Sequence, residues 1–240
     1  VVSEVSKIIG ESYFNTAEYT AAIPYLEAYK GKKGKWENTD YYQLGFAYYN
    51  TGDYNKALEQ FNKIKNAKNA LAQNAYYFLA DCYLRINQKT AAQNAFKSAS
   101  EMDFDLEVKE DAFFNYAKLS YEIGNPFETP PQVLISFLEA YPKHSQAELI
   151  GELLVNSYTK SGNYKAAIEI LEGKSGYKNN ERLERVLVLQ AVQEYENGKY
   201  FEASSLFERV LKIKENDLLE AYSLYWLGRT EYQRNQFDNA

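Results

Sequence analysis

The chain has 240 residues, of which 45% are hydrophobic and 25% are charged, as is usual for a folded protein. Its formal net charge is −6 and its pI is near 5.1, which argues against nucleic acid as a partner because phosphate binding needs clustered positive charge. No stretch approaches the roughly 18 apolar residues that cross a membrane, so we expect no direct membrane insertion from this segment.

The residues that usually carry chemistry are scarce. Cys82 is the only cysteine and His144 the only histidine. An internal disulfide is therefore impossible, and no cluster of Cys and His ligands exists for a metal. Only one histidine is available for a catalytic triad. We therefore expect no catalytic residue, no metal, no cofactor and no enzymatic activity.

Two charged runs are interpreted as surface. Lys30–Lys35 (KGKKGK) is short and interrupted by glycine, which is typical of a solvated loop. Glu101–Asp111 (EMDFDLEVKED) lacks the glycine and the terminal glutamate of a calcium-binding loop. We interpret it as a solvated linker that leads into a helix near Glu110.

One phrase recurs along the chain. In order, its copies are AEYTAAIPYL (17–26), GDYNKALEQF (52–61), NQKTAAQNAF (87–96), GNYKAAIEIL (162–171), GKYFEASSLF (198–207) and the truncated NQFDNA (235–240). One more copy, marked by Gly124 and Asn125, divides the long gap. The chain therefore contains seven copies of a unit of about 34–38 residues, which is the signature of a repeat architecture.

Each unit reads as two helices joined by a turn. In the second copy, helical spacing of i, i+3, i+4 and i+7 relates Tyr41, Leu44, Gly45 and Tyr48. Residues 57–64 repeat this spacing after Gly52, which ends the first helix and supplies the turn. Tyr48, its neighbour Tyr41, and Tyr54 are therefore expected to pack inside the unit.

The pattern resembles the tetratricopeptide repeat, with units that start near residues 3, 38, 73, 110, 148, 184 and 221. Unit position 8 is small in most copies: Gly10, Gly45, Ala80, Ala117, Val155, Ala191 and Gly228. Position 20 is alanine in six copies: Ala22, Ala57, Ala92, Ala167, Ala203 and Ala240. Position 24 is a large apolar residue: Leu26, Phe61, Phe96, Phe137, Leu171 and Phe207. Small residues let the two helices cross closely, and the large residue fills the space beside the crossing.

The resemblance implies an all-α fold, a right-handed superhelical solenoid of about seven helix-turn-helix units. We expect residues 1–240 to form one such array, excerpted from a longer chain. Two departures have structural consequences. Pro24 lies early in a second helix, which then starts late or kinks. Residues 125–131 (NPFETPP) predict a longer loop, in which Thr129 caps a helix that begins near Pro131.

In the family, the first helices line a concave face, and the resemblance implies that unit positions 2, 5, 9, 12 and 13 point into it. Four of the seven residues at position 5 and five of the seven at position 12 are aromatic. The predicted partner-binding groove consists of Tyr42, Phe46, Tyr49, Tyr77, Arg85, Phe114, Lys118, Tyr121, Tyr195, Tyr225, Arg229 and Tyr232. Aromatic side chains offer large contact area at low entropic cost.

An alternative stays open for these aromatics. Neighbouring first helices touch each other, so residues at positions 5 and 12 can simply fill the seams between them. The groove does not match the carboxylate-binding clamp of chaperone-binding members of the family, which pairs Lys at position 5 with Asn at position 9. Lys7 is followed by Glu11 at position 9, and Asn156 by contrast is preceded by Glu152 at position 5.

These features favour a protein–protein interaction scaffold that holds another protein or a peptide segment in an aromatic-lined groove. The alternatives are a non-catalytic repeat arm of a larger enzyme and a structural spacer. An enzyme needs a polar constellation that the sequence lacks, whereas a spacer would show no aromatic bias on the inner face.

Two expectations concern the surroundings of the chain. Residues 138–171 resemble repeats of bacterial cell-envelope proteins of the outer-membrane-assembly and Tol–Pal-associated type, which implies a periplasmic or envelope-associated location; the alternative is cytoplasmic. The matching residues are Tyr141, Pro142, Ser145, Ala147, Tyr158, Gly162, Tyr164 and Ala167. The last unit stops at Ala240, so Leu224–Leu227 are expected to expose apolar surface and to favour self-association through that uncapped end.

Overall fold

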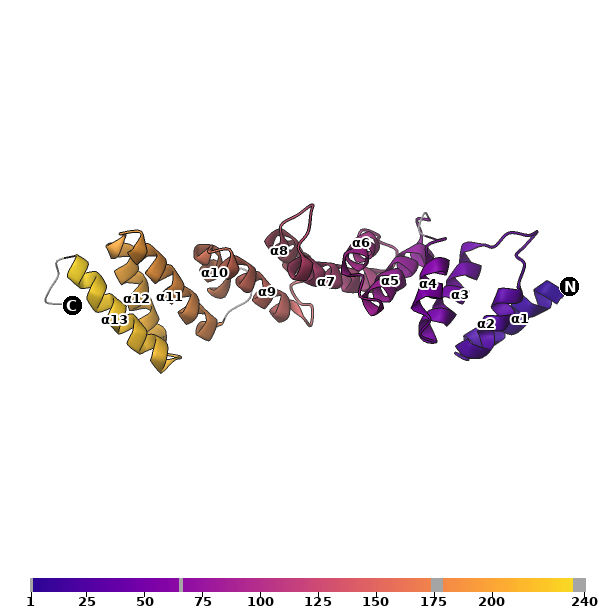
Figure 1. The fold of residues 1–240 in the computed structure, drawn as a ribbon, viewed down its shortest axis with the longest axis horizontal. Coiled ribbons are helices and arrows are strands. Elements are labelled where there is room, and N and C mark those ends of the chain that lie inside the picture. The colour runs from indigo at the N-terminus through magenta and orange to yellow at the C-terminus, as the bar shows by residue number, and fades with distance from the viewer. Residues whose placement is uncertain (1, 65–66, 174–178, 235–240) are drawn as a thin grey trace. The chain divides into compact units, whose positions relative to one another are not determined.

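The computed structural model describes residues 2–64, 67–173 and 179–234, and within these ranges it contains thirteen α-helices (Figure 1). The chain divides into two compact units, Val1–Gly124 and Asn125–Ala240, and the division falls where the sequence predicts its longest intra-repeat loop. The prediction of an all-α fold is confirmed. A single array through residues 1–240 stays a prediction, and each unit is described by itself below.

The first compact unit is a row of antiparallel helices. Its helices are α1 (Val2–Asn15), α2 (Tyr19–Ala28), α3 (Asn38–Asn50), α4 (Tyr54–Phe61), α5 (Ala70–Arg85), α6 (Lys89–Ser100) and α7 (Leu106–Ile123). Each helix packs against the next one in the chain. The first helices of neighbouring repeats also touch, since α1 contacts α3, α3 contacts α5 and α5 contacts α7.

The second compact unit follows the same plan. It contains α8 (Pro130–Ala140), α9 (Ala147–Lys160), α10 (Tyr164–Leu171), α11 (Asn180–Glu196), α12 (Tyr200–Ile213) and α13 (Asp217–Gln233). Consecutive helices pack in pairs here too, and α11 contacts α13 directly. The second helix of the seventh repeat, predicted from residues 235–240, lies outside the described residues.

Close helix crossings explain the small residues of the repeat. A Cβ atom added to Gly10 would lie 2.8 Å from Leu26 Cδ2, and one added to Gly45 would lie 3.0 Å from Phe61 Cε1. Both distances are too short for van der Waals contact without movement. The glycines therefore let the first helix of the repeat approach the large residue of the second, as the sequence predicts.

The two apolar columns of the repeat form the core. The alanines at position 20 that the structure describes are fully buried: Ala22, Ala57, Ala92, Ala167 and Ala203. The large residues at position 24 are buried as well: Leu26, Phe61, Phe96, Phe137, Leu171 and Phe207. Tyr48 is buried as predicted, whereas Tyr41 and Tyr54 are half-buried.

Turns and caps follow from local sequence. Gly52 has φ +83°, a left-handed conformation that L side chains avoid, and it reverses the chain between α3 and α4. Asp53 then caps α4 by accepting a hydrogen bond from the backbone N–H of Lys56 at 3.2 Å. The predicted cap at Thr129 is confirmed, and α8 begins at Pro130. The Gln132 side chain completes this cap by accepting from the backbone N–H of Thr129 at 3.0 Å.

One expectation about local structure is wrong, and for the helix with Pro24 the late start is excluded while a kink stays a prediction. Glu101–Asp111 is not a linker up to a helix near Glu110, because α7 already begins at Leu106. Asp105 starts this helix by accepting hydrogen bonds from the backbone N–H groups of Glu107 and Val108, both at 3.1 Å. In addition, α2 does not start late at Pro24. It runs from Tyr19 through the proline, and its core residues are held by packing against α1 and α3.

Candidate functional site

Polar contacts join the first helices of the first compact unit in sequence. Lys7 Nζ in α1 lies 2.6 Å from Asp40 Oδ1 in α3. The hydroxyl of Tyr49 in α3 donates to Asp81 Oδ2 in α5 at 2.6 Å. The hydroxyl of Tyr77 in α5 donates in turn to the Asp111 carboxylate in α7. These bonds lock neighbouring repeats together, because bonds to a charged partner are roughly twice as strong as neutral ones.

Phe78 is the centre of an aromatic cluster between α3 and α5. Its ring centroid lies 4.9 Å from that of Phe46 and 5.1 Å from that of Tyr49, both in edge-to-face geometry. Tyr77 and Phe61 are 5.7 and 6.0 Å away, and Tyr42 is 6.4 Å away. Such pairs add stability beyond their buried area. Four predicted groove residues, Tyr42, Phe46, Tyr49 and Tyr77, therefore lie in the packed seam that the sequence left open as an alternative.

The environment of these tyrosines shifts their acidity. Burial raises the pKa of Tyr42 to about 12. Burial, together with the hydrogen bond to Asp81, raises the pKa of Tyr49 to about 12. The pKa of Tyr77 is raised by burial and by its bond to Asp111. These phenols therefore stay neutral and act as hydrogen-bond donors at physiological pH.

We expect Tyr49→Phe to lower the free energy of unfolding by about 1.5–3 kcal/mol at pH 7, the usual contribution of a hydrogen bond to a charged group. Because the pKa of Tyr49 is raised above 10, its contribution is present below pH 10 and is lost as pH rises toward 12. The difference between wild type and Tyr49→Phe should therefore shrink above pH 10 in denaturation curves.

Tyr54→Phe is the matched control, because its ring packs 6.0 Å from that of Tyr49 and no hydrogen bond of its hydroxyl is found among the described residues. It should lose little stability at pH 7. Equal losses for the two variants at pH 7 would show that the Tyr49–Asp81 bond does not hold the seam.

The other predicted groove residues of this unit divide between surface and core. Arg85 is exposed, with Nε 3.3 Å from Asp81 Oδ2. Phe114 is buried, and Lys118 Nζ lies 5.2 Å from the centroid of its ring. Tyr121 is half-buried on the same helix, α7. The inner face of the first unit is thus largely occupied by its own side chains.

A comparable seam recurs between α11 and α13. The ring of Tyr195 lies 5.0 Å from that of Trp226 in edge-to-face geometry. The Arg229 guanidinium lies over both rings, 5.8 Å from Tyr195 and 5.2 Å from Trp226. Tyr225 and Tyr232 by contrast are exposed on α13. The predicted apolar surface at this end is present at Leu224 and Tyr225, which are both exposed, whereas Trp226 and Leu227 are half-buried.

The second unit also holds an open apolar pocket of about 530 Å³. It lies between α11 and α13, with one residue from α10. Its lining consists of Tyr164, Val188, Leu189, Val192, Gln193, Glu196, Leu218, Leu219 and Tyr222. Three of these are unusually exposed for apolar side chains: Leu189 by 42%, Leu218 by 77% and Tyr222 by 43%. A pocket of this size accepts one or two large side chains.

Unit positions connect this pocket to the predicted groove. Val188, Val192 and Glu196 stand at positions 5, 9 and 13 of the sixth repeat, and Tyr222 stands at position 2 of the seventh. These are positions that the resemblance assigns to the concave face. The predicted groove nevertheless lacks Val188 and Val192, because aliphatic residues at these positions carry no aromatic signal. It also lacks Tyr222, because unit position 2 is not aromatic in the other copies.

The described part of the chain contains no cluster of metal ligands, no reactive thiol and no helix that could cross a membrane. Nowhere in it do three or more His, Cys, Asp or Glu side chains gather so as to hold a metal ion. Burial raises the pKa of the Cys82 thiol to about 12, so this cysteine is inert as a nucleophile. None of the described helices combines the length and the apolarity needed to cross a membrane.

Comparison with known proteins finds the tetratricopeptide repeat in two segments of the chain. Family models of the tetratricopeptide repeat match residues 39–66 and 73–106. No curated protein sequence matches the chain significantly. The crystal structure of MamA protein is similar over 74% of this chain and 96% of its own, with a TM-score of 0.51 and 19% identity. At this identity the similarity concerns the fold alone.

Two further solved structures match the chain at lower TM-scores. A tetratricopeptide repeat protein from Parabacteroides merdae matches 99% of this chain and 83% of its own, with 16% identity and a TM-score of 0.42. PilF of Pseudomonas aeruginosa matches 92% and 96%, with 13% identity and a TM-score of 0.44.

Proposed function

The chain carries tetratricopeptide repeats, and from this premise we propose that it is a scaffold for protein–protein interaction that anchors a segment of a partner protein in the pocket between α11 and α13. The observation that carries the proposal is the apolar lining of this pocket together with the exposure of Leu189, Leu218 and Tyr222. Apolar side chains exposed around a concave surface are typical of interaction sites.

The lining also suggests what the partner contributes. Eight of its nine members are uncharged, which favours a large aliphatic or aromatic anchor side chain. Glu196 is the exception. Its side chain is exposed, and among the residues described no cation forms an ion pair with it. A Lys or Arg near the anchor in the partner segment would complement this carboxylate. We therefore propose a short segment with one large apolar residue and a nearby basic residue.

The aromatic seam between α11 and α13 supports this function. The edge-to-face contact of Tyr195 with Trp226, and the Arg229 guanidinium that lies over both rings, hold together the two helices that line the pocket. A preorganised surface loses less entropy on binding than a mobile one. A direct contribution to binding from the predicted groove residues stays a proposal, and Arg85, Tyr225, Arg229 and Tyr232 are those most exposed to a partner.

The two alternatives are distinguished by the same pocket. A structural spacer has no reason to keep large apolar residues exposed in a hollow. A repeat arm of a larger enzyme would use the pocket to hold either substrate or another domain, so it shares the binding function and differs only in its covalent context. A location in the bacterial cell envelope and self-association through the C-terminal end stay predictions.

Selection from a random peptide library on the immobilised chain tests the proposal. The recovered peptides should share a large apolar residue with Lys or Arg close to it in sequence. Binding should protect residues 188–196 and 218–222 from amide hydrogen exchange. Recovery of no specific peptide, or protection that maps elsewhere, would overturn the pocket as the binding site.

A further inference from the structure

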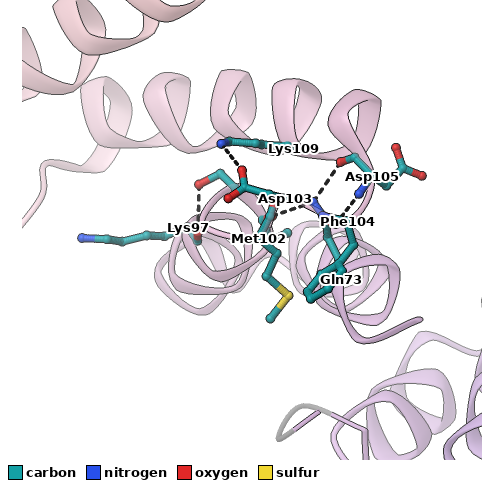
Figure 2. A network of polar contacts seen from close by, with 9 residues as sticks. Gln73, Lys97, Met102, Asp103, Phe104, Asp105 and Lys109 are labelled. Carbon is teal, nitrogen blue, oxygen red and sulfur yellow. Dashed lines mark hydrogen bonds and ion pairs between the residues drawn. The ribbon is translucent and has the colours of Figure 1, made fainter. Parts of the chain in front are cut away.

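Gln73 ties two helices of the first unit to the chain segment between them. This side chain, in α5, is completely buried. Its amide nitrogen donates to the backbone carbonyls of Ala99 at 3.2 Å, Met102 at 2.8 Å and Asp105 at 3.0 Å. Its carbonyl oxygen accepts from the backbone N–H groups of Phe104 at 3.1 Å and Asp105 at 2.8 Å (Figure 2). The connection from α6 to α7 is thereby fixed to α5.

Glu184 occupies the same place in the sixth repeat. Gln73 and Glu184 are each the first residue of their unit, in α5 and α11. The junction between α6 and α7 corresponds to the junction between α12 and α13. Asp105 caps α7 and Asn216 caps α13, and each side chain accepts hydrogen bonds from two backbone N–H groups of the first turn. Glu184 is also completely buried. It therefore faces the connection from α12 to α13 as Gln73 faces the connection from α6 to α7.

The chemical difference between the two side chains is the number of donors. An amide has both donors and an acceptor, whereas an ionised carboxylate only accepts. Among the described residues, neither carboxyl oxygen of Glu184 completes a hydrogen bond. An ionised Glu184 would have no proton to offer to the carbonyls of the junction, and a buried charge that completes no hydrogen bond with the nearby N–H groups of Glu215 and Asn216 is costly. The protonated form regains one donor.

The charged groups around Glu184 add to this effect. Glu215 in the connection and Glu220 in α13 act on it as like charges. Lys214 is the nearby cation of the connection, but its Nζ forms an ion pair with Glu220 at 3.2 Å.

The cations on the helices around Glu184 are also paired or exposed. On α11, Arg185 pairs with Glu181 at 2.8 Å, and Arg182 pairs with Glu152 of α9. Glu172, which follows α10, pairs with Arg209 of α12. Lys212, in the last turn of α12, is exposed.

Burial is the largest influence on Glu184 and raises its pKa above 4.5, as do Glu215 and Glu220. The backbone N–H groups of Glu215 and Asn216 act in the opposite direction. A carboxyl whose pKa is raised by folding stabilises the fold below its unfolded pKa, and this stabilisation is lost as pH rises through the folded pKa.

We propose that Glu184 is a protonation-controlled clamp on the start of α13. When neutral, it can both donate to the junction and accept from it, as Gln73 does. When ionised, it can only accept from the backbone N–H groups of Glu215 and Asn216, so the junction is held less firmly. Because Leu218, Leu219 and Tyr222 lie in the first two turns of α13 and form one wall of the pocket, the clamp also sets the shape of that pocket. Only this last effect rests on the proposed function.

Glu184→Gln tests the clamp without any partner. The variant gives the sixth repeat the side chain that makes five hydrogen bonds in the third. We expect its melting temperature at pH 7 to exceed that of wild type by about 2–4 °C, the shift that 1 kcal/mol produces in a chain of this size. The difference should shrink toward pH 4 as the wild-type carboxyl gains its proton. At pH 7, amides of residues 217–222 should also exchange more slowly than in wild type.

Glu208→Gln, at an exposed position in the middle of α12, is the control for removing one negative charge, and it should leave the melting temperature unchanged. Gln73→Glu should install the same pH-dependent loss in the first unit. Superimposable pH profiles for wild type and Glu184→Gln, with equal exchange at residues 217–222, would overturn the clamp. That outcome leaves the pocket untouched, whereas failure to select any peptide would count against the pocket and not against the clamp.

Discussion

Replacing Phe78 with alanine is expected to lower the free energy of unfolding by about 3 kcal/mol, the lower part of the range for phenylalanine truncation in cores. Phe78 is only half-buried, which would suggest less. However, five rings surround it, and two of them lie within 5.1 Å in edge-to-face geometry. Its removal would leave a gap between α3 and α5 that the remaining rings cannot fill without leaving their own contacts.

Phe104→Ala is the matched control for this prediction, since Phe104 lies in the same compact unit but is 54% exposed. Its side chain can be truncated while its backbone N–H keeps the bond to Gln73. Chemical denaturation followed by circular dichroism should show a large loss for Phe78→Ala and a loss below about 1 kcal/mol for Phe104→Ala. Equal small losses would mean that the ring cluster is not a packed seam.

Replacing Gln73 with leucine is expected to cost about 3 kcal/mol or more. The change keeps the volume similar, so the loss isolates the hydrogen bonds rather than packing. The N–H groups of Phe104 and Asp105 and the carbonyls of Ala99 and Met102 would lose a partner in a buried place. Each buried group left unsatisfied costs about 1–3 kcal/mol, although the chain can relax to satisfy some of them.

Gln88→Leu provides the control for Gln73→Leu, because Gln88 is exposed before α6 and its side chain makes no capping bond. Thermal melting should show Gln73→Leu well below wild type and Gln88→Leu close to it. If Gln73→Leu has the same melting temperature as wild type, the junction between α6 and α7 is held by packing alone, and the comparison with Glu184 loses its basis.

The repeat could be predicted because the size of the side chain at three unit positions, 8, 20 and 24, is dictated by the close crossing of the two helices. Gly45, Ala57 and Phe61 must be small, small and large for two helices to cross closely, and nothing else in a helix pair requires that combination. Columns with such a requirement recur in nearly every copy. The pairing of helices and their buried positions could therefore be predicted without coordinates.

The seam residues could not be predicted in the same way. Phe78 stands at unit position 6, where the other copies have Ile8, Gln43, Asn115, Leu153, Leu189 and Trp226. Each seam is filled by whatever side chains fit that pair of repeats, so the column has no common residue type. The aromatic bias at positions 5 and 12 was visible, but it could not distinguish a seam from a binding surface.

The buried role of Gln73 and the start of α7 were not predicted from the sequence either. Gln73 lies near the start of a helix, where a polar side chain is ordinary, and only the fold shows that it is buried. The start of α7 was available from the sequence, since Asp105 is a favoured N-cap residue followed by a helical pattern. The density of acidic residues around it led to the interpretation as a solvated linker.

The measurement that tests the account most directly is the affinity of a library-selected peptide for wild type and for Leu218→Ala, by isothermal titration calorimetry. Leu218 lines the pocket yet is 77% exposed, so its truncation should not disturb the fold. Leu106→Ala is the matched control, because Leu106 is a similarly exposed leucine at the start of α7. We predict that Leu218→Ala weakens binding about fivefold or more, a change of at least 1 kcal/mol, and that Leu106→Ala binds like wild type. Unchanged affinity for Leu218→Ala, or an equal loss in both variants, would contradict the account.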